Sequence, residues 1–279
     1  MTDFPHTTVG AVSLSRMIVG TNWMLGFSHA SVAKDKFIRE FQTRPRMAAI
    51  LSVFLEAGVN AVMSGYWPDL RDTIRDAEDQ TGRKMFWIQT PHFNLLPGGP
   101  PELDPEPVFD KCAATGATFC MPHQCVTDAL LDRRAGVIRD IDRYAAMIRD
   151  RGMIPGLSTH MPETIPYADK AGADVETYIQ IYNAAGFLMQ VEGDWVMSVI
   201  RNARKPVMII KPLAGGRLLP VVGLAFVWST IRDQDMVAVG VTTPDEAREL
   251  IQLSLDLLAR RIPAGDLQFT RSKQSLAGG

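Results

Sequence analysis

The feature that most constrains the fold is an eightfold alternation of short apolar runs with longer segments of helical spacing. The apolar runs are rich in Val, Ile, Met and Phe and are bounded by turn residues, which is typical of buried strands. They occupy residues 16–22, 59–65, 84–90, 117–123, 153–160, 176–183, 206–212 and 235–241. Parallel strands that are apolar on both faces need a helix in each return connection. The alternation therefore predicts a single (β/α)8 TIM barrel over residues 1–279.

An open, doubly wound sheet is the alternative that the same alternation allows. The strand count of eight favours the barrel, and no G-x-G-x-x-G motif follows the first run. Glycine stands where four helices are expected to end before the next strand, at Gly58, Gly116, Gly152 and Gly172. A Thr243-Pro244-Asp245-Glu246 sequence predicts the start of the last helix, because Thr is a good N-cap and Pro is favoured at the first helical position.

Two connections are longer than a strand-to-helix turn needs. They span 22–42 and 93–107, and such excess length is usually functional or covers a site. The first, which includes Trp23 and His29, is predicted to fold over the mouth of the barrel as a lid. The second is rich in Pro and Gly and is interpreted as a rim loop.

Composition restricts the class of partner. The chain has 29 basic and 31 acidic residues, a net charge of −2, and no basic stripe, so a small-molecule substrate is expected rather than nucleic acid or an anionic membrane. No apolar run reaches the roughly 18 residues of a membrane span, and a cytoplasmic location is predicted. Three cysteines without C-x-x-C spacing argue against a disulfide framework. The segment 218–231 is apolar on nearly all sides, which is typical of a helix covered by an extra segment or by a second subunit.

Lys211 ends the seventh apolar run and is followed by Pro and a Gly-rich loop. In a barrel, its ammonium is expected to project into the mouth, where a cation requires an anionic partner. Its roles remain open at this point. It could contact a phosphate or carboxylate of a ligand, lower the pKa of Tyr66, form a Schiff base, or pair with a structural carboxylate at the rim.

His123 and His160 end the fourth and fifth runs, which are neighbours in a barrel. They could share a divalent metal, with Asp69, Asp128 and Glu163 as reserve ligands, although the strand ends supply few carboxylates. They could instead transfer protons without a metal, as in an isomerase or lyase working near neutral pH.

The order of the motifs resembles the aldo-keto reductase superfamily over most of the chain. The first strand "LSRMIVGTNW", the fifth "IPGLSTHMPETI", the sixth "YIQIYN" and the last two units, "KPLAGGRL" and "VAVGVTTPDEARELI", carry the resemblance. It implies a NADP or NAD cofactor. The residues that the resemblance places on this cofactor are Ser158, Gln180, Lys211, Leu213, Gly215, Gly216, Thr242 and Thr243. Arg248 is the nearest candidate for contact with a 2′-phosphate.

The catalytic positions depart from the family pattern. Met63 stands at the aspartate position, Pro68 at the tyrosine position and Pro91 at the lysine position, and only His123 matches. Ile210 replaces an aromatic residue that would stack on the nicotinamide. Tyr66 is two residues early, and a phenol with an ordinary pKa near 10 is a weak acid without a neighbouring cation.

Three classes of function follow. The first is an aldo-keto-reductase-like, NAD(P)-linked oxidoreductase acting on a small polar carbonyl or polyhydroxylated compound, with His123, Tyr66, Lys211 and His160 as the catalytic candidates. The second is a cofactor-free or metal-assisted isomerase or lyase that uses the two histidines. The third is a catalytically silent barrel that binds a small molecule.

Overall fold

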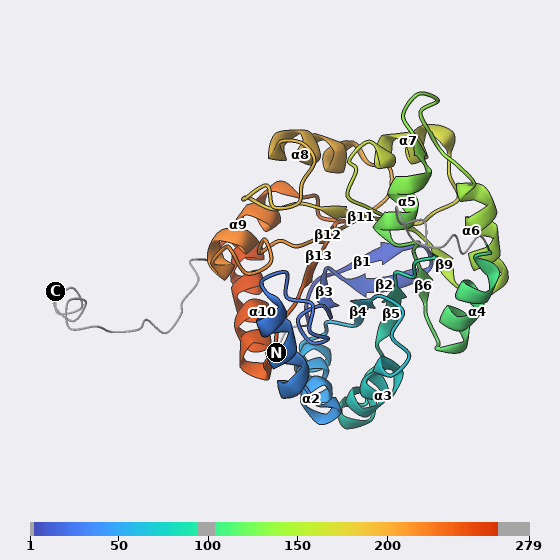
Figure 1. The fold of residues 1–279 in the computed structure, drawn as a ribbon. Coiled ribbons are helices and arrows are strands. Elements are labelled where there is room, and N and C mark those ends of the chain that lie inside the picture. The colour runs from blue at the N-terminus through green and yellow to red at the C-terminus, as the bar shows by residue number, and fades with distance from the viewer. Residues whose placement is uncertain (1–2, 94–103, 262–279) are drawn as a thin grey trace, which may run out of the picture.

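The eight predicted strands are all present and form one barrel in the computed structural model, which describes residues 3–93 and 104–261 (Figure 1). Every neighbouring pair in this sheet is parallel. In chain order, the strands are β3 (Met17–Gly20), β4 (Ala61–Ser64), β5 (Phe86–Gln89), β6 (Phe119–Cys120), β9 (Ile154–Pro155) with β10 (Leu157–Thr159), β11 (Tyr178–Ile181), β12 (Val207–Ile210) and β13 (Met236–Val239).

The fifth strand is divided into β9 and β10 at Gly156. The first part pairs with β6 and the second with β11, so the strand changes partner at this residue and completes the circle. A Cβ at Gly156 would lie 2.9 Å from the carbonyl oxygen of Thr177 and 2.6 Å from the side chain of Met121. Glycine is therefore required where the backbones approach this closely.

Eight helices form the outer layer, one after each barrel strand, as the alternation predicted (Figure 1). The described residues assign them to α2 (Arg44–Glu56), α3 (Leu70–Thr81), α4 (Glu106–Ala114), α6 (Ile141–Asp150), α7 (Thr164–Ala171), α8 (Gly193–Asn202), α9 (Pro220–Thr230) and α10 (Pro244–Leu258). The four glycines expected at helix ends all have left-handed φ angles, between 70° and 86°. Thr243 caps α10 as predicted, because its side chain accepts a hydrogen bond from Glu246 N.

The structure adds elements that the sequence pattern did not predict. An antiparallel hairpin, β1 (His6–Val9) with β2 (Val12–Ser15), buries Val9 and Leu14 in the barrel interior. The connection after β3 contains α1 (Val32–Phe41). The connection after β6 contains α5 (Gln124–Leu130) and a short hairpin, β7 (Leu131–Asp132) with β8 (Val137–Ile138). Of the rim loop predicted at 93–107, residues 94–103 lie outside the described part of the chain.

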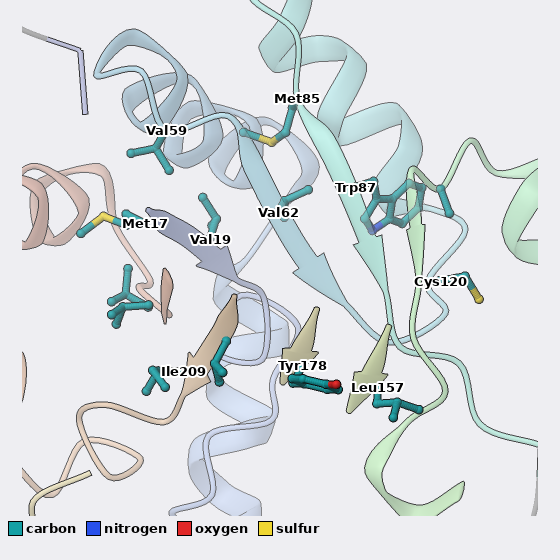
Figure 2. Close-up of a cluster of buried hydrophobic side chains, with 14 of the residues drawn as sticks. Met17, Val19, Val59, Val62, Met85, Trp87, Cys120, Leu157, Tyr178 and Ile209 are labelled. Atoms are coloured by element: carbon teal, nitrogen blue, oxygen red, sulfur yellow. The ribbon is translucent and has the colours of Figure 1, made fainter. Parts of the chain in front are cut away.

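Two apolar clusters hold the layers together. The smaller one fills the barrel and includes Ile18, Ile88 and Met208. The larger one lies between strands and helices, and Figure 2 shows part of it with Val62 and Trp87 labelled. Alternate residues of each strand serve the two clusters, as expected from the twofold period of a strand. This alternation decides which side chains can reach the barrel mouth.

The apolar helix predicted at 218–231 is α9. Leu224, Val227 and Trp228 bury one face of it, whereas Val221 and Val222 remain 45% and 47% exposed. No described segment covers these two valines. Within residues 3–93 and 104–261, no helix has the length and apolar character needed to cross a membrane.

Candidate functional site

A cavity of about 980 Å³ opens at the carboxyl ends of the barrel strands. Its floor includes Met63, Ser158 and Ile179, and it continues past the loop after β12 to the first turns of α10. This end of a (β/α)8 barrel is where the strand-to-helix loops meet, and it is where such barrels bind their ligands. Its size and its place at this end of the barrel make it the candidate site.

Lys211 lines this cavity directly after β12. Its backbone is left-handed, with φ 57°, and its carbonyl oxygen accepts a hydrogen bond from Ala214 N at 2.9 Å. A lysine in this conformation costs of order 1–3 kcal/mol, and such residues concentrate at functional sites. His29 and Leu188, which also line the cavity, have left-handed φ angles of 56° and 57°.

The ammonium of Lys211 has no carboxylate within 4.0 Å among the described residues. Burial alone lowers the pKa of Lys211 to about 8. The side chain is therefore still mostly protonated at neutral pH, but it exchanges a proton far more readily than an ordinary lysine. The structural ion pair considered from the sequence is not formed in this part of the chain.

His123 and His160 line the same cavity, so the structure brings both together with Lys211. Burial, with smaller effects of His92 and Lys211, lowers the pKa of His123 to about 4. Burial and then Lys211 lower the pKa of His160 to about 3. Both imidazoles are neutral near pH 7. The expectation that they exchange protons near neutral pH is therefore not supported while the cavity holds no anion.

The surroundings of the two histidines fix their positions. His123 Nδ1 lies 3.1 Å from Cys125 Sγ and 3.4 Å from Cys125 N, at the start of α5. The carboxylate of Asp128 accepts hydrogen bonds from His160 N at 3.2 Å and from the Thr159 hydroxyl. Burial raises the pKa of Asp128. This carboxylate orients the chain around His160.

The predicted reserve ligands do not complete a metal site. Asp128 is occupied as described, Glu163 pairs with Arg133 at 2.6 Å, and Asp69 stands at the start of α3. Across residues 3–93 and 104–261, no three His, Cys, Asp or Glu side chains are grouped so that they could hold one ion. The metal-assisted alternative thus lacks a third ligand in the described chain.

Gln180 and Tyr66 do not line the cavity. Gln180 alternates with Ile179, which faces the interior, so its side chain lies on the outer side of β11. It is fully buried there, and its Nε2 donates to Ile181 O at 3.2 Å. The prediction that Gln180 opens to the mouth is wrong for this reason. Tyr66 packs against the outer apolar cluster. Ser158 does line the cavity, since it pairs with Ile179 in register.

Leu213, Gly215 and Gly216, which the resemblance assigned to the cofactor, line the cavity. The N–H groups of residues 214, 216, 217 and 218 donate to Lys211 O or Leu213 O within the loop. Those of Leu213 and Gly215 donate to no acceptor in the described chain. Glycine is needed at 216, where φ is 82° and a Cβ would lie 3.2 Å from the ring of Trp23. The loop therefore presents two unused donors beside the cavity.

The far end of the cavity is acidic. Glu246 and Glu249 of α10 line it, and Glu246 accepts hydrogen bonds from Thr242 N and Oγ1 at 2.6 and 2.9 Å. The hydroxyls of Thr242 and Thr243 are thus used within the helix start rather than facing the cavity. Arg248 also lies off the cavity, where it pairs with Asp245 at 2.7 Å.

The segment after β3, which the sequence predicts to be a lid, forms part of the cavity wall. Trp23 and His29 line the cavity. Arg217, from the loop after β12, donates to His29 O at 3.1 Å and stacks on Phe187, with its guanidinium carbon 4.0 Å from the ring centre. Loops after the first, sixth and seventh barrel strands therefore meet above the site.

The sequence and the fold were compared with those of known proteins. No protein-family model and no curated protein matches the sequence. A Pseudomonas aeruginosa protein named "putative aldo-keto reductase" is 14% identical, with 92% of this chain and 97% of that chain covered and a TM-score of 0.63. An aldo/keto reductase of Brucella melitensis gives 11% identity, 95% coverage of both chains and a TM-score of 0.57.

A truncated 3-deoxy-D-arabino-heptulosonate 7-phosphate synthase of Thermotoga maritima is also similar. It has 13% identity, a TM-score of 0.53, and 92% and 93% of the two chains covered. At sequence identities this low, structural similarity shows that the folds are alike, and it does not show that the activities are alike. The chain is therefore a (β/α)8 barrel whose fold is similar to that of these aldo-keto reductases.

Proposed function

We propose that this barrel is an oxidoreductase that uses a nicotinamide dinucleotide to reduce the carbonyl group of a small polar compound. The observation that carries the proposal is one continuous cavity that connects Lys211 and His123 with the loop after β12 and the start of α10. A volume of about 980 Å³ is at the upper end for ligand pockets and suits a ligand as large as a dinucleotide together with a small substrate.

The residues present fit such a cofactor. The unused N–H groups of Leu213 and Gly215 and the guanidinium of Arg217 are donors for its phosphates. The Ser158 hydroxyl would hold the carboxamide of the nicotinamide, and Glu246 or Glu249 would accept from ribose hydroxyls. When bound, the cofactor would supply a hydride. The carboxylates of Glu246 and Glu249 would repel a 2′-phosphate, so we propose that the cofactor is NAD rather than NADP.

Lys211 is the group that replaces the missing tyrosine in this proposal. Its ammonium, with a pKa of about 8, would stabilise the negative charge that develops on the carbonyl oxygen and then donate a proton to it. The neutral imidazole of His123 would donate a hydrogen bond to the same oxygen. Tyr66 is not needed, because it packs against the outer cluster.

Titration with NADH and NADPH tests the proposal. Trp23 lines the cavity, so binding should change tryptophan fluorescence, and Trp23→Phe should remove most of the change without abolishing affinity in calorimetry. We expect NADH to bind about tenfold or more tightly than NADPH, a difference of about 1.4 kcal/mol. The absence of binding by either dinucleotide at millimolar concentration would refute the proposal.

A lyase with a Schiff-base lysine is the second candidate. It is favoured by the lowered pKa of Lys211 and by Met63, Pro68 and Pro91 at three family catalytic positions. In that reaction, the neutral amine attacks the substrate carbonyl carbon and water leaves. Treatment with borohydride in the presence of a carbonyl substrate would then attach the substrate covalently to Lys211, which mass spectrometry would detect.

A further inference from the structure

We infer that the substrate is a 2-oxo acid, whose carboxylate and carbonyl oxygen both contact the ammonium of Lys211 between His123 and His160. The inference rests on the proposed function for the reduction step, but the anion-binding part stands on the cavity alone. It specifies a chemical class that the fold does not imply, since carbonyl reduction by itself requires no charge on the substrate.

The first support is the missing counter-ion. Lys211 is partly buried, and no carboxylate of the described chain lies within 4.0 Å of it or raises its pKa. Two carboxylates, Glu246 and Glu249, do line the cavity, yet they leave the ammonium uncompensated. An unpaired buried cation is costly, and a functional site commonly accepts this cost when the ligand brings the opposite charge.

The second support is the direction in which Lys211 faces. Lys211 lines one cavity together with His160, His123 and His29, which follow three different strands, β10, β6 and β3, and its charge lowers the pKa values of all three imidazoles. The ammonium therefore lies toward the centre of the mouth, among neutral imidazoles that can donate to ligand oxygens. Arg217 remains at the loop for the cofactor phosphates. Because Arg217 serves the cofactor phosphates, Lys211 is left to contact the substrate.

The third support is that a single ammonium has two tasks. It must balance the charge of the anion, and it must stabilise the oxygen of the reacting carbonyl. In a 2-oxo acid, the carbonyl oxygen and one carboxylate oxygen are attached to adjacent carbons, so a single ammonium with three N–H donors can contact both. Met63, Ile179, Ile210 and Ala238 supply an apolar wall beside this point, which suits a short alkyl chain.

The reduction balances without a further reactant. A bound dihydronicotinamide would supply a hydride, and with it two electrons, to the carbonyl carbon, while the ammonium of Lys211 would donate a proton to the carbonyl oxygen. The products would be the 2-hydroxy acid, the oxidised cofactor and a neutral lysine, which would regain a proton from solvent. The carboxylate takes no part in the electron transfer and serves to hold the substrate.

Anion binding should also draw protons into the site. The charged or titratable groups that face His160 are Lys211, His123, His29 and, through its backbone contact, Asp128. His92 and Lys211 face His123. A carboxylate placed among them offsets the charge of Lys211 and stabilises protonated imidazole. Binding of the 2-oxo acid is therefore expected to take up protons between pH 5 and pH 7.

Calorimetry with three probes tests the inference on the cofactor-free protein. The probes are 2-oxobutanoate, butanone without the carboxylate, and butanoate without the ketone. We expect 2-oxobutanoate to bind about tenfold or more tightly than either of the others. Its binding enthalpy at pH 6 should differ between two buffers of different ionisation enthalpy, which reports proton uptake, and His160→Gln should reduce that difference.

Two variants of Lys211 complete the test. Lys211→Met should weaken 2-oxobutanoate binding about tenfold or more, and Lys211→Arg should restore part of it, while NADH affinity changes little in both. The inference is overturned if Lys211→Met weakens NADH binding instead, if inorganic phosphate binds as tightly as 2-oxobutanoate, or if borohydride traps 2-oxobutanoate covalently on Lys211. If 2-oxobutanoate binds as expected but neither dinucleotide binds, the proposed oxidoreductase fails while the anion site stands.

Discussion

The two ends of the barrel treat buried charge in opposite ways. At the amino ends of the strands, the carboxylate of Asp235 is fully buried and accepts from Arg232 at 2.7 and 2.9 Å and from Val207 N at 2.9 Å. Arg149 there bonds Asp174 at 2.6 Å and Glu176 at 2.8 Å. At the carboxyl ends, Lys211 has no such partner in the described chain.

The difference separates stability from function. A buried charge that is paired and hydrogen-bonded contributes to a fixed structure, whereas an unpaired one leaves binding energy for a ligand. In (β/α)8 barrels, the amino end serves stability and the carboxyl end serves chemistry. Glu176, which precedes β11, is one of the carboxylates of the amino end.

The largest effect is expected at the amino end. Asp235→Asn leaves the guanidinium of Arg232 without its carboxylate and should lower the free energy of unfolding by about 3–5 kcal/mol. Urea denaturation measures this loss. Asp79→Asn in α3 is the control, because Asp79 is exposed and makes no hydrogen bond or ion pair among the described residues, so it should change stability by no more than about 0.5 kcal/mol. Equal effects of the two variants would remove the contrast between paired and exposed charges at this end.

At the carboxyl end, removal of the charge should have the opposite sign. Lys211→Met removes an unpaired ammonium and should raise the free energy of unfolding at pH 7 by about 1–3 kcal/mol. This range starts from about 1.4 kcal/mol for each unit by which folding lowers the pKa, and it is reduced because solvent screens a partly exposed charge. Folding lowers the pKa of Lys211 from 10.5 to about 8. Between these values the unfolded chain binds more protons, so wild-type stability rises with pH.

The advantage of Lys211→Met should therefore shrink as pH rises from 8 to 10.5. Unfolding free energies of both proteins across this range measure it. If the variant is less stable than wild type at pH 7 without any ligand, Lys211 has a structural partner after all. The comparison between the two ends would then not hold.

A smaller effect is expected from His160 in acid. Its pKa is about 3 in the fold against 6.5 in the unfolded chain, so the unfolded chain binds more protons between these values. Wild-type stability is therefore lost as pH falls through this window. Relative to wild type, His160→Gln should gain about 1–2 kcal/mol between pH 7 and pH 4. A constant difference between the two proteins over this range would show that the imidazole is not held neutral.

The barrel itself could be predicted from the sequence, and the placement of side chains only in part. The eight apolar runs, the glycines at helix ends and the Thr243 cap are local signals, and local signals specify parallel strands and helices well. Ser31, whose side chain accepts from Lys34 N, and the stacked Phe37 and Phe41 are signals for α1 that a reading of 22–42 as loop overlooked.

The errors at the site have physical causes. The position of Gln180 near the end of a strand predicts that its side chain opens to the mouth. Neighbouring residues of a strand face opposite sides, however, and because Ile179 faces the barrel interior, Gln180 faces outward. Thr242 and Thr243 were assigned to a cofactor, but Glu246 lies one helical turn away and engages both. The pKa values of His123 and His160 depend on burial and on Lys211, which is distant in sequence. Such long-range effects leave no mark in a local pattern.

The smallest expected effect concerns the segment that crosses the mouth. Arg217 holds it from the loop after β12 through His29 O and the ring of Phe187, whereas Arg39 holds it from within, through Gly26 O at 3.0 Å. Arg217→Ala removes the hydrogen bonds to His29 O and Ala214 O and one cation–π contact, all made by an exposed side chain, so stability should fall by only about 1 kcal/mol. Backbone hydrogen exchange at residues 22–31 should nevertheless become faster.

Arg39→Ala provides the control for this prediction. It should also speed exchange at residues 22–31, but without changing the loop after β12, because its contact lies within the segment. If the segment acts as a lid, both variants should increase the dissociation rate of NADH, which stopped-flow measurements would detect. Arg39→Ala decides the question, because Arg217 is itself a proposed donor to the cofactor phosphates. Unchanged release together with faster exchange would mean that the segment only rests on the mouth. The contrast between a structural end and a ligand-binding end would then depend on Lys211 and the histidines, without a contribution from the lid.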